Sequence, residues 1–267
     1  MFNEPSQLLH PSDPVLSQAR LYPSFLEDGE NFACMLVLAG GGYEHVSHQE
    51  GPPVAGWLNS LGISAAVLEY TVSDGDAIYP QPQQQALYAL RWLRANAKRL
   101  NIDPNRIGVI GFSAGGHLAA CLSQGFDHAD WLLDPDDALR NTSARPDASI
   151  LSYPVISSGD IGHQGSFDNL LGKGSRAIER EVLSWEKHAH PKSPPTFLWH
   201  TAEDAAVPVE NSYLMAMALQ QNKTPHELHV FPQGEHGLGL CSIYFRRQAG
   251  AAQWRALAQR WLLELGF

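Results

Sequence analysis

The 267-residue chain has only three cysteines, Cys34, Cys121 and Cys241, which lie far apart and form no C-x-x-C pair. Cysteines spaced in this way do not build the paired ligand sets of a structural metal site. Two of the three fall inside an expected strand or helix, where a thiol packs as a small buried apolar group. We therefore expect reduced thiols and a cytoplasmic protein.

Basic residues are also scarce, because 18 Lys and Arg stand against 28 Asp and Glu, for a net charge of −10. Nucleic-acid binding needs clustered Lys and Arg, so we expect no nucleic-acid partner. No apolar run is long enough to span a bilayer, and the N-terminal stretch lacks the basic and apolar regions of a signal peptide. We therefore expect no membrane partner. Hydrophobic residues make up 44% of the chain, enough for the core of a globular protein.

Motifs that hold metals or cofactors are missing as well. The sequence has no H-E-x-x-H and no G-x-x-x-x-G-K-[ST], and the glycine run at 40–42 lacks dinucleotide-binding spacing. We expect no metal and no cofactor. His117 is expected to pack beneath a site rather than to do chemistry. Five further histidines lack ligand spacing and receive no role: His45, His48, His163, His188 and His190.

The clearest positive signal is a strand-turn-helix around Ser113. The apolar run Ile107–Ile110 predicts a buried strand, and the small residues after Gly116 predict the start of a helix. Between them stands G-x-S-x-G, with Ser113 at its centre, which is the nucleophile-elbow motif in the context that it requires. Gly111 and Gly115 relieve the crowding of so sharp a turn. The pattern predicts Ser113 as a nucleophile.

Strand and helix patterns alternate along the rest of the chain. Strands are predicted at Phe32–Ala39, Gly62–Tyr70, Ala148–Tyr153, Thr196–His200 and His226–Phe231, and helices at 53–61, 83–100, 210–221 and 248–265. This alternation predicts an α/β fold with a mostly parallel, doubly wound sheet.

The irregular parts of the chain lie at its start and in its second half. We predict one domain over 1–267, with a surface arm at 1–14 and a weak strand or hairpin at 15–26. The acidic stretch 127–147 is expected to be a loop or partial helix. Residues 154–195 lack a long apolar run and are predicted to form a small lid insertion with an isolated helix at 184–190.

A serine nucleophile needs a base, and His236 is the best candidate. It follows the last predicted strand and stands between Gly234 and Gly237, which let its loop fold back over Ser113. The carboxylate that orients this histidine should follow an earlier strand. Asp204 is favoured for this role over its neighbour Glu203.

The loop after the first buried strand is rich in glycine and predicts an oxyanion hole. Successive residues without Cβ atoms let backbone N–H groups approach a substrate. We name Gly41, Gly42 and Ala114 as donors and leave Tyr43 open as a further one. The aromatic side chains of Tyr43, Tyr79 and Trp185 are left open between pocket lining and core.

Together these segments resemble the esterase/lipase-type α/β-hydrolases, a group that includes hormone-sensitive-lipase-like and acetyl-xylan-esterase-like proteins. The resemblance covers about residues 32 to 240 and is strongest at G-G-G-Y from Gly40, at the stretch Ile102–Leu118 and at Pro194–Asp204. It implies an α/β-hydrolase fold and a serine hydrolase, and G-G-G-Y is associated with deacetylation of sugars. Ala39 replaces the histidine that opens the lipase motif, and Gln85 stands where relatives often carry Asp.

The sequence therefore predicts a serine carboxylesterase that cleaves short acyl esters, acetyl esters of carbohydrates in particular, through an acyl-enzyme. The short acyl group follows from the lid, where Leu170 and Leu171 are the only adjacent aliphatic pair in the polar stretch 163–172. The alternatives are a peptidase or amidase on the same fold and a catalytically silent binding protein. The expected partner is a small-molecule ester, and homo-oligomer formation is left open.

Overall fold

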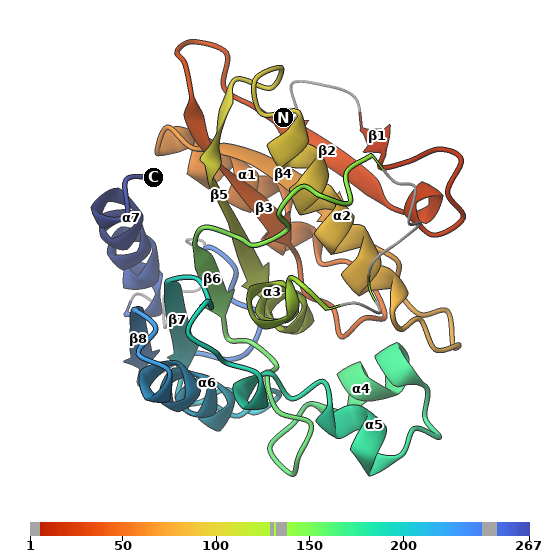
Figure 1. The fold of residues 1–267 in the computed structure, drawn as a ribbon. Coiled ribbons are helices and arrows are strands. Elements are labelled where there is room, and N and C mark those ends of the chain that lie inside the picture. Colours follow the sequence, from red (N-terminus) through yellow and green to blue (C-terminus); the bar gives the residue numbers. More distant parts are fainter. Residues whose placement is uncertain (1–5, 129–130, 132–137, 242–249) are drawn as a thin grey trace.

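The computed structural model describes residues 6–128, 131, 138–241 and 250–267, whose strands form one eight-stranded sheet of order β1-β2-β4-β3-β5-β6-β7-β8 (Figure 1). The first two strands pair antiparallel and the other six run parallel. The strands are β1 Gln7–Leu8, β2 Arg20–Ser24, β3 Phe32–Leu38, β4 Ser64–Glu69, β5 Ile102–Phe112, β6 Ser149–Ser152, β7 Thr196–Thr201 and β8 His226–Phe231.

Helices cover both faces of this sheet, as the right-handed crossovers of parallel strands require. Buried side chains of α2, α3 and α6 join one core cluster, and those of α1 and α7 join the cluster on the opposite face (Figure 1). The helices are α1 Pro52–Ser60, α2 Gln81–Ala95, α3 Ala114–Gly125, α4 Gln164–Leu171, α5 Ala177–Glu181, α6 Glu210–Gln221 and α7 Trp254–Glu264. The predicted doubly wound α/β-hydrolase fold is confirmed.

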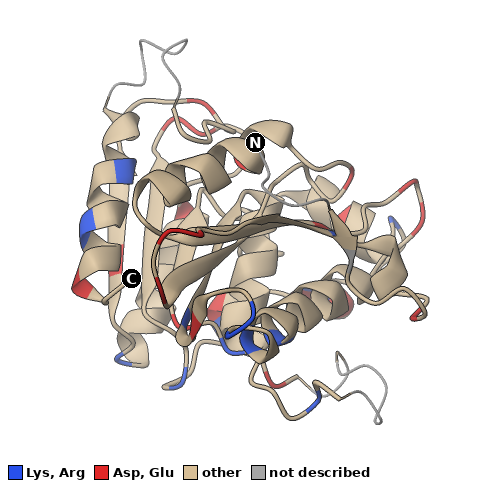
Figure 2. Ribbon diagram, turned by 90° about the horizontal axis from the view of Figure 1, so that it is seen from above, with Lys and Arg blue, Asp and Glu red and all other residues tan. Residues whose placement is uncertain are grey.

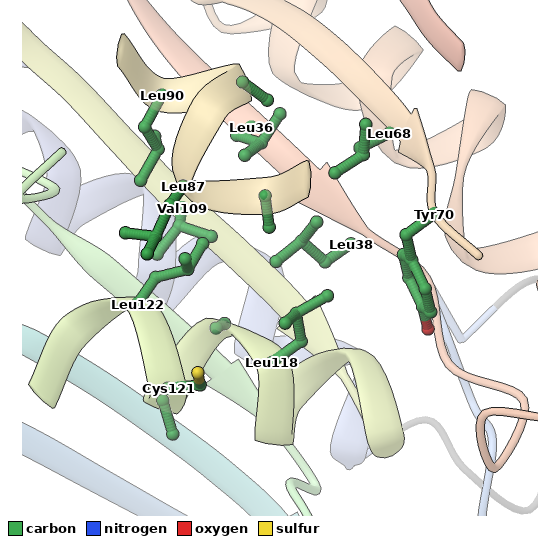
Figure 3. Packing of buried hydrophobic residues seen from close by; sticks show 14 of the residues in the cluster. Leu36, Leu38, Leu68, Tyr70, Leu87, Leu90, Val109, Leu118, Cys121 and Leu122 are labelled. Carbon is green, nitrogen blue, oxygen red and sulfur yellow. The ribbon is translucent and has the colours of Figure 1, made fainter. Parts of the chain in front are cut away.

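Strand β3 shows why its sequence is apolar without interruption. Leu36 and Leu38 point into the cluster beneath α2 and α3, whereas Met35 and Val37 point into the cluster beneath α1 and α7. Side chains alternate between the faces of a strand, so a strand covered on both sides needs apolar residues throughout. Figure 3 shows Leu36 and Leu38 packed beside Val109 of β5 and under the two helices.

The sheet sets the location of the site, because parallel strands end at one edge. Gly40 follows β3, Ser113 follows β5, Asp204 follows β7 and His236 follows β8. Ligands of open α/β sheets bind at this carboxyl edge. Charged residues lie mostly away from the central strands, with Lys and Arg singly or in small groups on the outer helices and loops (Figure 2).

The insertion at 154–195 differs from its prediction. The expected helix at 184–190 is wrong, because only a 3-10 turn forms at Trp185–Lys187. Tertiary contacts shape this turn: the Trp185 N–H donates to the Ile156 carbonyl, and the buried indole packs against Trp131 and His117. Two unpredicted helices, α4 and α5, precede it. Helix α4 buries Phe167 and Leu170, whereas no residue of α5 is buried.

The remaining expectations are met in part. The weak strand signal at 15–26 corresponds to β2, which pairs antiparallel with β4. The predicted arm at 1–14, the stretch 127–147 and the closing helix at 248–265 each include residues outside the described ranges; within them, the closing helix is α7 preceded by a 3-10 turn at Ala251–Gln253. None of the described helices has the length and apolar character needed to cross a membrane.

Candidate active site

Ser113 lies at the sharp junction between β5 and α3 with a strained backbone, φ 53° and ψ −118°. The flanking glycines are sterically required. A Cβ atom on Gly111 would lie 2.1 Å from the Gly115 carbonyl oxygen, and one on Gly115 would lie 2.2 Å from the Leu38 carbonyl oxygen. The turn therefore packs directly against β3 and holds the serine side chain at the carboxyl edge of the sheet.

The three side chains predicted as nucleophile, base and orienting acid form one hydrogen-bonded chain. Ser113 Oγ lies 2.7 Å from His236 Nε2, and His236 Nδ1 lies 2.6 Å from Asp204 Oδ2. Since the ionised carboxylate only accepts hydrogen bonds, Nδ1 carries the proton and Nε2 accepts from the serine hydroxyl. This is the arrangement in which an imidazole can take a proton from a serine.

Asp204, rather than Glu203, contacts His236. The Asp204 carboxylate is fully buried and also accepts from the backbone N–H groups of Ala206 and Val207, at 3.0 and 2.9 Å. Burial alone would raise the pKa of Asp204, but hydrogen bonds from His200, His236 and Val207 outweigh it and hold that pKa well below its usual range. Glu203 is exposed and instead accepts from the Gly234 N–H.

The glycine run after β3 lies beside this chain. Gly41 and Gly42 have φ of +124° and +63°, and a Cβ on Gly41 would lie 2.1 Å from the His45 carbonyl oxygen. Within the described residues, the N–H groups of Gly41, Gly42 and Ala114 donate to no protein acceptor. Tyr43 likewise has a positive φ and an unused N–H. The loop thus offers several free donors next to the serine.

A cavity of about 350 Å³ opens over the serine. Apart from its glycines, the residues that line it all carry polar side chains, which can form hydrogen bonds with a ligand that carries hydroxyl groups. The lining residues are Gly41, Gly42, Glu44, His45, Ser47, Gln49, Glu50, Ser113, His163, His236 and Gly237.

Sequence patterns did not predict His163 and Glu50 as residues of the site, although both line the cavity. His163 caps helix α4, and its Nδ1 accepts from the Ser166 N–H at 3.2 Å. In the neutral ring the proton therefore lies on Nε2, which has no partner among the described residues. Burial, and then His236, lower the pKa of His163 and favour that neutral form. The spacing H-x-x-S before a helix could have indicated that His163 caps α4. Glu50 lies in a short 3-10 turn, where no sequence pattern indicated its position in the site.

The structure also shows the positions of the residues whose roles the sequence left open or assigned to packing. His117 is 1% exposed and lies with Nδ1 2.9 Å from the Tyr43 hydroxyl, and burial lowers the pKa of His117 to about 4. Tyr43 and Trp185 are core residues, and partly buried Tyr79 packs against the core. Gln85 is buried and forms hydrogen bonds with Thr71 and the Val15 carbonyl, which connect the N-terminal segment to α2.

The chain is similar to proteins that are already known. The BD-FAE family model matches residues 24–219. Among curated proteins, endo-1,4-beta-xylanase B of Butyrivibrio fibrisolvens is 40% identical over 79% of this chain and 33% of its own length. An acetylxylan esterase of Xylanibacter ruminicola is 31% identical over 81% of this chain and 43% of its own length. The chain thus spans less than half of these curated relatives.

A solved structure covers the chain more completely. The acetyl ester-xyloside bifunctional hydrolase of Caldicellulosiruptor lactoaceticus is 44% identical, covers 97% of this chain and 91% of its own, and superposes with a TM-score of 0.86. The family model covers well over half of the present sequence, including the glycine loop and the elbow. The chain belongs to the BD-FAE family and is an esterase-type α/β-hydrolase.

Proposed function

We propose that this chain is a serine carboxylesterase with Ser113 as nucleophile, His236 as base and Asp204 as the residue that orients it. Ser113 Oγ attacks the ester carbonyl while His236 Nε2 takes its proton, and the same nitrogen then protonates the departing alcohol. Water hydrolyses the acyl-enzyme by the reverse sequence. The observation that supports this proposal most strongly is the hydrogen-bonded chain from Ser113 through His236 to Asp204.

The tetrahedral oxyanion is proposed to receive hydrogen bonds from the N–H groups of Gly41, Gly42 and Ala114. Donors that are already fixed and unused stabilise a developing charge without reorganisation. Ala114 is also the first residue of α3, where the helix dipole favours an anion. The Tyr43 N–H stays open as a further donor.

The proposed substrates are short acyl esters, acetylated carbohydrates above all. Two similarities support this choice: one relative is named an acetylxylan esterase, and the similar solved structure is described as an acetyl ester-xyloside hydrolase. The polar side chains that line the cavity support it as well. A neutral His163 adds a fixed Nε2–H donor to the cavity wall, suited to a sugar hydroxyl. The insertion 154–195, which contributes this histidine, is still proposed as the lid.

The serine mechanism is tested by labelling and turnover together. A fluorophosphonate should label the wild type, and Ser113→Ala should lose both the label and about 10³-fold or more of kcat for p-nitrophenyl acetate. Ser60→Ala, at an exposed serine that ends α1, is the matched control. Near-normal turnover in a folded Ser113→Ala protein would disprove the mechanism, and faster cleavage of a p-nitroanilide than of the matching ester would indicate an amidase.

The substrate class is tested separately. A p-nitrophenyl series from acetyl through butyryl to octanoyl should show falling kcat/KM, because the described residues that line the cavity include no aliphatic side chain against which a longer acyl chain could gain about 0.8 kcal/mol per buried CH₂. A maximum at octanoyl would overturn the short-acyl proposal. Within the described residues, no cluster of three or more His, Cys, Asp or Glu is arranged to hold a metal. We expect activity to survive chelation, whereas a zinc-reversible loss would contradict that expectation.

The cytoplasmic location stays a prediction from the cysteines, all three of which are buried free thiols. Fractionation of the native host, followed by detection of the protein in each fraction, tests it. Enrichment outside the cytoplasm would show that these thiols reflect packing rather than a reducing compartment.

A further inference from the structure

Glu50 is a buried carboxylate that the proposed mechanism does not use. It ends the 3-10 turn His48–Glu50 and is only 3% exposed. Its Oε2 accepts from the Gly40 N–H at 2.8 Å, and its Oε1 accepts from the Tyr153 hydroxyl at 2.6 Å. The Ser47 side chain is a further hydrogen-bond partner. In the part of the chain that the structure describes, no Lys or Arg pairs with this carboxylate.

The second of these bonds continues into the loop that carries His236. The Tyr153 hydroxyl accepts from the Gly239 N–H at 2.8 Å while it donates to Glu50. The Tyr153 ring also meets the His236 ring edge to face, with centroids 5.1 Å apart. One tyrosine thus connects the Glu50 carboxylate both to the backbone of the histidine loop and to the imidazole itself.

The first bond fixes the start of the glycine loop. A Cβ atom on Gly40 would lie 2.8 Å from Glu50 Oε2 and 2.9 Å from Ser113 Cβ. Gly40 is therefore held between the carboxylate and the elbow, and its N–H donates to the carboxylate. The next residues, Gly41 and Gly42, are the proposed oxyanion donors, so the position of Gly40 decides where their N–H groups lie.

A carboxylate is an expensive group to bury, since desolvation opposes the charged form. Burial raises the pKa of Glu50, although hydrogen bonds from Tyr153 and Gly40 and the nearby His236 act against this. Both of its oxygens accept hydrogen bonds from protein donors. A side chain with two acceptor oxygens, placed between two catalytic loops, suits a role in holding them.

We propose that Glu50 is a positioning residue for the proposed esterase reaction. Its carboxylate links two loops. It binds the glycine loop directly at the Gly40 N–H, and it reaches the histidine loop at Gly239 through the Tyr153 hydroxyl. This bridge sets the spacing between the oxyanion donors and the imidazole on either side of Ser113. The inference rests on the proposed function, because it assigns Glu50 a part in aligning that same site.

The test combines Glu50→Gln, Tyr153→Phe and the double variant. In Glu50→Gln one oxygen still accepts from Gly40, but the amide nitrogen cannot accept from the Tyr153 hydroxyl; Tyr153→Phe removes the same link from its other end. Misplacement of catalytic groups by about 1 Å costs about 10²-fold, so each single variant should lose about that much kcat with KM for p-nitrophenyl acetate unchanged. The double variant should lose no more than the worse single, because both break one link.

Turnover is normalised to the sites that a fluorophosphonate labels to completion, and folding is followed by urea unfolding. Glu27→Gln, an exposed carboxylate between β2 and β3 at the opposite edge of the sheet, is the control for charge removal. A folded Glu50→Gln protein with wild-type kcat would overturn the proposal. The proposal would also be overturned if the losses of kcat in the two single variants multiplied in the double variant.

If Glu50→Gln does not fold, Tyr153→Phe decides alone. A lower kcat at unchanged KM supports the bridge, and a wild-type kcat refutes it. Failure of the proposed function itself has a different signature. In that case the wild type shows no esterase activity, or Ser113→Ala keeps it, whatever the Glu50 variants do.

Discussion

Two histidines form hydrogen bonds with Ser113, one through its side chain and one through its backbone, and their surroundings differ. His236 reaches the serine Oγ with its ring, whereas His117 donates its backbone N–H to the serine carbonyl at 3.1 Å. The His236 side chain is 23% exposed and hydrogen bonded to a buried carboxylate. His117 is 1% exposed, and within the described ranges the hydrogen-bond partners of its ring are Tyr43, Trp185 and the Leu183 carbonyl.

The difference shows what separates a base from a packing residue at one site. A catalytic imidazole must accept a proton, so it needs a carboxylate to stabilise its charged form and a path to the substrate. His236 has both. His117 has neither, and burial, opposed only by the Leu183 hydrogen bond, lowers its pKa to about 4 and keeps it neutral. Nearness to the serine therefore does not by itself make a histidine catalytic.

The largest loss of activity is expected when the carboxylate that distinguishes His236 from His117 is removed. Asp204→Asn should lower kcat by about 10⁴-fold, because the amide favours the wrong imidazole tautomer. Glu203→Gln is the matched control, since this neighbouring carboxylate is exposed and accepts a hydrogen bond from the Gly234 N–H rather than from His236. Steady-state kinetics on p-nitrophenyl acetate measures both variants. A greater loss in Glu203→Gln than in Asp204→Asn would transfer the orienting role to Glu203.

A smaller effect is expected at His163, the third histidine of the region, which lines the cavity and, among the described residues, hydrogen bonds to Ser166 and not to Ser113, Asp204 or His236. His163→Phe removes its Nε2–H donor while keeping a ring. We expect kcat/KM for an acetylated xyloside to fall about 10-fold, the value of about one hydrogen bond, while p-nitrophenyl acetate is hydrolysed as before. Equal losses on the two substrates would instead show that the ring supports the general shape of the pocket.

The smallest effect on activity is expected at His117, where the change should appear in stability. The pKa of His117 is about 4 in the folded chain against an ordinary value of 6.5. Below pH 6.5 the unfolded state therefore binds the proton first, and the free energy of unfolding falls as the pH drops toward 4. At about 1.4 kcal/mol per pH unit, this one group accounts for about 3 kcal/mol.

Urea unfolding of the wild type and His117→Gln at about pH 7 and about pH 4.5 measures this contribution. The variant should lose less stability between the two conditions than the wild type does, because glutamine does not titrate. An identical pH dependence in both proteins would show that His117 is not held neutral by burial, and the contrast with His236 would then fail.

Much of the fold and part of the site could be predicted because the signals are local. An apolar run such as that of β3 is typical of a strand covered on both faces. Gly111 and Gly115 flank Ser113 because backbone oxygen atoms lie where a Cβ would be. Such constraints act within a few residues, so they leave a pattern that the sequence displays directly. The insertion at 154–195 had no such pattern, since tertiary contacts of Trp185 replaced the expected helix with a single turn.

The sequence favoured Asp204 over Glu203, but both follow β7 and differ by one position, so it could not show which carboxylate contacts His236. Only the folded turn, in which the N–H groups of Ala206 and Val207 hold Asp204 inward, separates them. The bridge through Glu50 lies still further from sequence reasoning. Its parts stand at positions 40, 50, 153 and 239, and they meet because the strand order brings the ends of β3, β6 and β8 to one edge. Sequence determined the steric requirements of each turn, whereas tertiary structure alone decided which polar groups from distant turns would share hydrogen bonds.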